Sequence, residues 1–300
     1  MSLLAVHWHE VVNFDDYGAL LPLVRNSLYA GVALGLVGGL VGVFVIARDL
    51  PFAVHGVSEL SFAGASGALL LGASVVTGSF VGSVTAALLI GLLGGRAREK
   101  SSVIGVLMPF GLGLGILFLS LYHGRAANKF GLLTGQIVAI DDSSLATLVV
   151  TTVLVVGVLA VLWRPLMFAS VDPDVARARG VPVRALDLAF MLLLGCTVAI
   201  AVQVVGALLV LALLATPAAA AIRVTSSPVL MPLLSVCFAL TAMLGGILLA
   251  LGTAVPISPY VTTVSFATYL VSRLLGRRPT RITAATQAPA DRVLTAGGAR

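Results

Sequence analysis

Long apolar stretches alternate with short polar segments through most of the sequence. Stretches with the length and composition of membrane-spanning helices lie at residues 27–47, 53–76, 78–95, 103–122, 144–163, 187–205, 206–222, 229–251 and 257–275. A helix needs about 20 predominantly apolar residues to cross the hydrocarbon core of a bilayer, and none of these stretches resembles the short alternating strands of a membrane barrel. The pattern predicts an all-α, polytopic transmembrane bundle of about eight or nine spanning helices, depending on how the chain divides near Thr77 and Gly206.

The polar segments predict how the chain is organised and oriented. We expect an interfacial N-terminal segment at 1–26, a transmembrane domain at 27–278 and a disordered cytoplasmic tail at 279–300. Cytoplasmic loops of membrane proteins are enriched in Lys and Arg. Four basic segments are therefore predicted to lie inside, and they contain Arg96, Arg98 and Lys100; Arg164, Arg177, Arg179 and Arg184; Arg223; and Arg273, Arg277, Arg278 and Arg281.

Composition agrees with a membrane protein and excludes other classes. The chain is 59% hydrophobic and only 10% charged, whereas soluble domains contain about 25% charged residues. Its net charge of +6 lies mostly in the basic segments, so it does not indicate nucleic acid binding. Cys196 and Cys237 both lie inside apolar stretches, which excludes a disulfide framework or a zinc knot.

Two ionisable side chains, His55 and Glu59, interrupt the second apolar stretch. Residues four apart lie on one face of a helix, so an imidazole nitrogen and a carboxylate oxygen at this spacing can bind one divalent cation. Ionisable groups inside a membrane segment are costly and mark substrate or ion pathways. The competing interpretations are a hydrogen-bonded packing pair and a pair at the membrane boundary. His55 and Glu59 are therefore the candidate metal ligands.

Other histidines are weaker candidates. The segment starting at His9 and Glu10 comes within one residue of the zinc-protease pattern H-E-x-x-H, but Asn13 stands where the second histidine belongs. We interpret this segment, with His7, as an interfacial anchor. His123 is expected in a solvated outward loop, where the sequence does not decide whether it takes part in metal transfer.

No complete enzymatic motif is visible. Residues 94–101 share the first glycine, the lysine and the serine of the pattern G-x-x-x-x-G-K-S/T, but Glu99 occupies the position of the second glycine. A carboxylate at that position would repel phosphate, so ATP hydrolysis would have to come from another chain. The nucleophile and base of an intramembrane hydrolase are also not found. The sequence therefore predicts that the chain itself is not an enzyme.

A short helix is predicted after the fifth apolar stretch, at about 172–182. Asp172 is a suitable N-cap, Pro173 suits the first helical position, and Asp174 complements the positive end of the helix dipole. Gly180, followed by Pro182, ends the helix. A helix of about two turns between membrane spans suggests a docking element for a cytoplasmic partner. The alternative is a connector that lies on the membrane surface.

This segment resembles the coupling helix of the permease subunits of metal-type ATP-binding-cassette importers. The family's D-P-x-x-A-R-x-x-G-V-P pattern is matched by Asp172, Pro173, Ala176, Arg177, Gly180, Val181 and Pro182. Further similarity lies at residues 203–209 and 215–219, and the resemblance extends from about residue 20 to residue 275. It implies that residues 172–182 contact the cytoplasmic ATPase.

The resemblance also extends to the candidate metal ligands. The family carries a G-D-A-L-S-H-x-x-x-P-G segment whose Asp and His lie four apart in the translocation pathway. Aligning the chain on Ser58 and Gly64 places His55 at the Asp position, Glu59 at the His position and Ala63 at the Pro position. The resemblance thus implies a transient transport site in which imidazole and carboxylate have exchanged places.

The resemblance implies a permease for zinc, with manganese or iron also compatible, in the bacterial cytoplasmic membrane. The expected partners are two ATP-binding subunits, an extracytoplasmic metal-binding protein and a second copy of the chain, with no nucleic acid. No permanently bound cofactor is expected, and ATP would act only through the partner ATPase. The alternatives are a permease for a metal chelate such as a siderophore or cobalamin, and a secondary transporter driven by an ion gradient.

Overall fold

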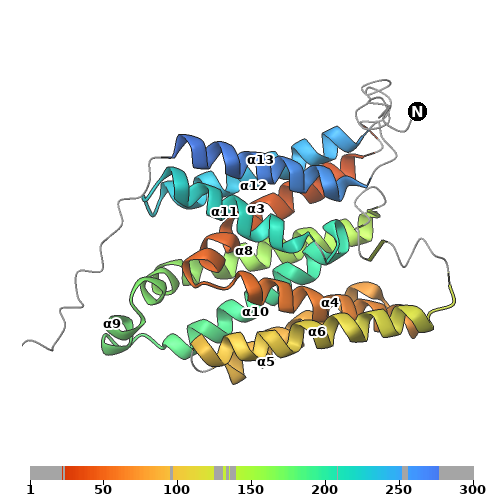
Figure 1. Cartoon of the computed structure of the whole chain (residues 1–300), viewed down its shortest axis with the longest axis horizontal. Helices are drawn as coiled ribbons and strands as arrows, with labels where there is room; N and C mark the ends of the chain where they lie inside the picture. The colour runs from red at the N-terminus through yellow and green to blue at the C-terminus, as the bar shows by residue number, and fades with distance from the viewer. Residues whose placement is uncertain are drawn as a thin grey trace, which may run out of the picture.

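Figure 1 shows a computed structural model that describes residues 22, 24–94, 97–124, 131, 132, 135, 140–207, 209–251 and 256–276. The described part is helical and contains no strand. In chain order its main helices are α3 (Arg25–Ala47), α4 (Pro51–Leu70), α5 (Val75–Leu93), α6 (Ala97–Leu121), α8 (Asp142–Val171), α9 (Pro173–Ala178), α10 (Val183–Val205), α11 (Val210–Val224), α12 (Leu230–Ala250) and α13 (Ile257–Leu275). The predicted all-α polytopic bundle is confirmed.

Six helices in this part of the chain are long and apolar enough to cross a membrane, namely α3, α5, α6, α8, α10 and α12. This number is smaller than the eight or nine spans that the sequence predicted. The other predicted spans coincide with α4, α11 and α13. Serines and the His55–Glu59 pair interrupt α4, α11 has only 15 residues, and α13 contains many serines and threonines.

Two predicted boundaries are wrong. Helix α8 continues to Val171 through Arg164 and Pro165, which were expected in a loop. Proline removes a helical hydrogen bond, but Leu166 beyond it is fully buried, so packing stabilises the extra turns. The sequence placed the break between the second and third apolar stretches at Thr77, but the structure places it earlier. Gly72 has a φ of +68°, a left-handed conformation that ends α4.

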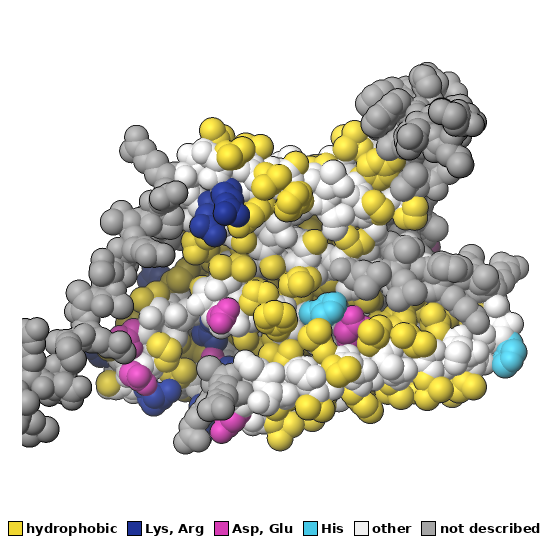
Figure 2. Space-filling model, in the orientation of Figure 1, with side chains coloured by type: hydrophobic (Ala, Val, Ile, Leu, Met, Phe, Trp, Pro, Cys, Tyr) yellow, Lys and Arg dark blue, Asp and Glu magenta, His cyan; other side chains and the backbone are white. Residues whose placement is uncertain are grey.

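The helices form two groups that contact α8. Helices α3, α11, α12 and α13 pack together on one side, and α4, α5, α6 and α10 pack together on the other (Figure 1). Helix α8 contacts both α3 and α10. Figure 2 shows charged side chains gathered at the end of the molecule where α9 lies, while hydrophobic side chains are spread along the helices. We call this the α9 end.

Candidate metal site and coupling helix

The turn before α4 positions the first candidate ligand. Helix α3 ends in a Schellman motif, in which the Leu50 amide donates to Val45 O at 2.8 Å and the Asp49 amide donates to Ile46 O at 3.2 Å. Asp49 adopts the left-handed conformation, with a φ of +55°, which Asp tolerates better than most residues. Pro51 then begins α4 and suits its first turn. His55 therefore lies one turn into the helix.

His55 and Glu59 meet on α4 as the sequence predicted. The Nε2 atom of His55 lies 3.5 Å from Oε1 of Glu59. The Glu59 side chain is only 4% exposed and that of His55 is 27% exposed. The separation is longer than the usual hydrogen bond of about 2.7–3.2 Å. The geometry therefore gives little support to a tight hydrogen-bonded pair.

The same separation suits two ligands of one cation. Two atoms about 2.1 Å from a tetrahedral metal lie about 3.4 Å apart. Among the described residues, Nδ1 of His55 is buried and has no hydrogen-bond partner. Permanent metal sites usually fix the ligating imidazole through a hydrogen bond of its other nitrogen. The absence of such a bond is compatible with a ligand that must also release its cation.

The described residues contain no group of three or more His, Cys, Asp or Glu side chains suited to a metal ion. His55 and Glu59 thus offer two protein ligands, and a bound cation would complete its coordination with water or with other groups. A closed structural zinc site uses four protein ligands. The two side chains alone therefore do not form such a closed site.

A buried chain of hydroxyl groups links α4 to α5 and α10. Ser61 Oγ lies 2.7 Å from Ser79 Oγ, and Ser79 Oγ in turn donates to the Ala199 carbonyl oxygen at 3.1 Å. Both serines are fully buried. Because buried hydroxyls are costly to leave without partners, the chain favours one rotation of α4. That rotation sets the direction of the neighbouring Glu59.

Helix α6 packs closely against the same part of α4. A Cβ atom added at Gly111 would lie 2.5 Å from Leu60 Cδ1 and 3.0 Å from the backbone carbon of Glu59, whereas one added at Gly113 would meet nothing within 4 Å. Overpacking typically costs about 1–3 kcal/mol. We therefore expect Gly111→Val to lower thermal stability, and the matched variant Gly113→Val to leave it near native. Equal effects of the two variants on thermal unfolding would contradict this packing argument.

The predicted short helix is present as α9, and its end signals act as expected. The Asp172 carboxylate accepts hydrogen bonds from the amides of Asp174 and Val175, at 3.1 and 3.0 Å. Pro173 is the first helical residue. Gly180, with a φ of +81°, ends the helix in a Schellman motif whose Val181 amide donates to Ala176 O at 3.0 Å. Helix α9 has six residues.

One face of helix α9 packs against the rest of the protein, and another face is exposed. Ala176 is fully buried, whereas Val175 is 45% exposed. The side chains of Arg177 and Asp174 form an ion pair of 2.8 Å and are 63% and 90% exposed. The exposed part therefore combines an apolar side chain with a charged pair.

The remaining candidates do not join this site. His7, His9 and Glu10 lie outside the described residues. His123 is exposed beyond the end of α6. Cys196 and Cys237 are free thiols.

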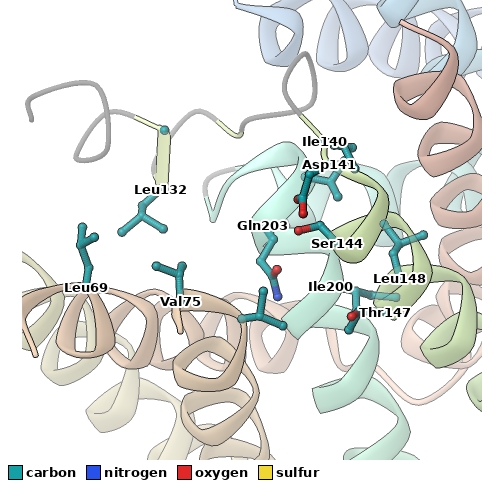
Figure 3. Close-up of a pocket in the computed structure, with 13 residues that line it drawn as sticks. Leu69, Val75, Leu132, Ile140, Asp141, Ser144, Thr147, Leu148, Ile200 and Gln203 are labelled. Carbon is teal, nitrogen blue, oxygen red and sulfur yellow. The ribbon is translucent and has the colours of Figure 1, made fainter. Parts of the chain in front are cut away.

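A pocket of about 270 Å³ lies away from the His55–Glu59 pair, which does not line it. Figure 3 shows the Asp141 carboxylate and the Ser144 hydroxyl beside Gln203, with Leu69 among the apolar residues across the pocket. Hydrogen bonds from Ser143 and Ser144 lower the pKa of Asp141. The Gln203 amide donates within α10 to Ala199 O at 3.1 Å.

Sequence reasoning did not identify the contacts that Asp187 makes with distant residues. Its carboxylate pairs with Arg48 at 2.5 Å and with Lys100 at 3.1 Å. Lys100 was considered above as part of an incomplete phosphate-binding pattern, and its ammonium group binds this carboxylate instead. No local sequence signal joins Arg48 to Asp187, because 139 residues separate them.

Several curated proteins are similar to this chain. It is 29% identical to the manganese transport system membrane protein MntC of Halalkalibacterium halodurans, over 78% of this chain and 80% of the relative. It is 29% identical to the manganese import system permease protein ScaB of Streptococcus parasanguinis, over 87% and 94%. It is 26% identical to the high-affinity zinc uptake system membrane protein ZnuB of Buchnera aphidicola, over 85% and 98%.

A solved structure described as PsaBC from Streptococcus pneumoniae in complex with Fab has a TM-score of 0.77, with 25% sequence identity, and covers 86% of this chain and 96% of its own. The model of the ABC 3 transport family matches residues 21–276. This range includes the His55–Glu59 pair, α9 and every helix described above. The chain therefore belongs to the ABC 3 transport family of membrane permeases.

Proposed function

We propose that this chain forms the membrane pathway of an importer for a divalent transition-metal cation, and that His55 and Glu59 bind the cation during transport. The observation that carries the proposal is the 3.5 Å separation between the imidazole and the buried carboxylate. Support comes also from relatives whose names refer to manganese or zinc transport. The chain would work as a pair of copies around a shared pathway, since symmetric assembly is the usual form of such oligomers.

Charge supports an orientation with the α9 end in the cytoplasm of a bacterial cell. Lys and Arg side chains gather at that end (Figure 2), and cytoplasmic segments are enriched in these residues. Two ATPase subunits would then dock at residues 172–182, with Asp172, Pro173, Ala176, Arg177, Gly180 and Val181 forming the coupling segment. A metal-binding protein would deliver the cation at the opposite face. ATP binding and hydrolysis would switch the pathway between outward-open and inward-open states.

The ligand set limits the class of cation. One imidazole and one carboxylate suit zinc, and they are also compatible with manganese or ferrous iron. Magnesium and calcium prefer sites made entirely of oxygen atoms. We propose zinc or manganese as the physiological cargo, with the imidazole providing the selection against magnesium and calcium.

Uptake by the complete transporter tests this assignment. We expect uptake of zinc or manganese to be saturable. We also expect each of these two metals to inhibit uptake of the other competitively. Magnesium and calcium at the same concentrations should leave uptake near its uninhibited level, because neither favours an imidazole ligand. The measurement uses radiolabelled metal in cells that express all subunits, with cells lacking the permease as the control. Uptake of an intact metal chelate in place of the metal ion would contradict the proposal and favour a chelate permease.

A further inference from the structure

A cluster of polar side chains joins four helices at the α9 end. The Arg48 guanidinium pairs with Asp187 at 2.5 Å and donates through Nε to Ser170 Oγ at 2.8 Å. Lys100 reaches the second oxygen of the same carboxylate at 3.1 Å. The four residues come from the end of α3, from α6, from α8 and from α10. We call Arg48, Lys100, Ser170 and Asp187 the Arg48 cluster.

Burial makes the Arg48 cluster costly to break. The Arg48 side chain is only 8% exposed, and its guanidinium lies 5.4 Å from the centre of the Phe190 ring. Burial lowers the pKa of Arg48, while the charge of Asp187 acts in the opposite direction. Asp187 is 30% exposed, so it is the loss of Asp187 that is costly, because it leaves the buried Arg48 charge uncompensated. The contact is therefore expected to persist while the helices move.

The Arg48 cluster contacts both sides of α9. Ser170 lies in the last turn of α8, two residues before the Asp172 cap. Asp187 lies in the second turn of α10, the helix that follows α9. Arg48 therefore binds the segment that enters α9 and the segment that leaves it. If α9 is displaced while Arg48 stays in place, the contacts of Arg48 with Ser170 and Asp187 are strained.

Arg48 and Lys100 also connect the cluster to the two helices that meet at the proposed metal ligands. Arg48 is followed, after Asp49 and Leu50, by α4, which carries His55 and Glu59. Lys100 lies in the first turn of α6, whose Gly111 packs against the backbone of Glu59. Helix α4 and helix α6 are thus both joined to the α8–α9–α10 segment through Asp187. These are the two helices that meet at Glu59.

We propose that Arg48, Lys100 and Asp187 are positioning residues that transmit the displacement of α9 to the helices holding the transported cation. This inference rests on the proposed function, because it takes α9 as the helix that the ATPase moves. Energetic coupling between distant sites is carried by contiguous contacts such as buried ion pairs. Loss of the Asp187 carboxylate then uncouples ATP hydrolysis from transport, while binding of the ATPase at α9 is retained.

The test compares Asp187→Asn, Asp187→Glu and Asp142→Asn in the complete transporter in proteoliposomes. Asp142 is a matched control, because its carboxylate accepts a hydrogen bond from Asn26 at 2.8 Å at the opposite end of the molecule. Zinc and manganese uptake, ATP hydrolysis, ATPase co-purification and thermal unfolding are measured. We expect Asp187→Asn to reduce the metal transported per ATP at least about fivefold, with partial recovery in Asp187→Glu and no change in Asp142→Asn.

Should Asp187→Asn not assemble, Lys100→Gln takes its place. This variant leaves the Arg48–Asp187 pair intact and removes only the link to α6, so a smaller but measurable fall in metal per ATP is expected. An unchanged ratio in an assembled variant overturns the proposal. A parallel loss of uptake and hydrolysis also overturns it, because that is the behaviour of a purely structural contact. Failure of the proposed function is separate: the native transporter itself would then take up neither zinc nor manganese.

Discussion

Replacing either His55 or Glu59 by alanine is expected to reduce metal uptake by about 10- to 100-fold, the range found when groups that support a metal site are removed. The reason is the small proposed ligand set: His55 and Glu59, 3.5 Å apart, are its only two protein ligands among the described residues, so either substitution removes half of the proposed set. Uptake of radiolabelled zinc and manganese by cells containing the complete transporter provides the measurement. Permease abundance in the membrane is compared in parallel.

The exchanged order of the two ligands permits a sharper experiment. In the double variant His55→Asp with Glu59→His, one carboxylate and one imidazole still lie four residues apart, in the order that the resembled family segment has. We expect this double variant to transport more metal than either alanine variant. The matched control is Ser66→Ala, because the Ser66 hydroxyl is also buried on α4 but has no hydrogen-bond partner among the described residues.

These outcomes separate a metal site from a packing pair. If the alanine variants reach the membrane in native amounts and transport both metals at the native rate, His55 and Glu59 do not bind the cargo. If the pair only stabilises the fold, uptake should fall in step with permease abundance. A selective loss of uptake at native abundance is the result that the proposed transport site requires.

Arg177→Glu is expected to abolish most transport by weakening the association of α9 with the ATPase subunit. Arg177 is 63% exposed and pairs with Asp174 on α9, so the substitution replaces an exposed ion pair with two like charges. Residues that dominate a protein interface contribute about 2 kcal/mol or more, which corresponds to about a 30-fold loss of affinity. Co-purification of the ATPase subunit measures the association, and metal uptake measures its consequence.

The control for Arg177→Glu is Arg223→Glu. Arg223 is an exposed arginine in the last turn of α11, and α11 ends on the same side of the molecule as α9 (Figure 1). The two variants change net charge equally, so only a specific contact at α9 predicts different results. Native ATPase binding by Arg177→Glu would indicate instead that α9 is a connector on the membrane surface.

The sequence by itself determined the features that depend on neighbouring residues. Hydrophobic length predicted the helical bundle, and the i, i+4 spacing placed His55 and Glu59 on one helical face. The end signals of α9 are also local, because the Asp172 cap reaches amides only two and three residues away. Such interactions form within one or two helical turns, so the order of residues is sufficient to predict them.

Only the tertiary structure decided which distant groups meet. The Ser61–Ser79 contact, the packing of Gly111 against Glu59 and the Arg48–Asp187 pair each join separate helices. The length of α8 was also decided by packing, since Leu166, beyond Pro165, is fully buried. Apolar membrane helices carry few signals that specify their neighbours, because close packing of small residues is possible on many faces. The partners of Asp187 therefore became visible only once the helices were assembled.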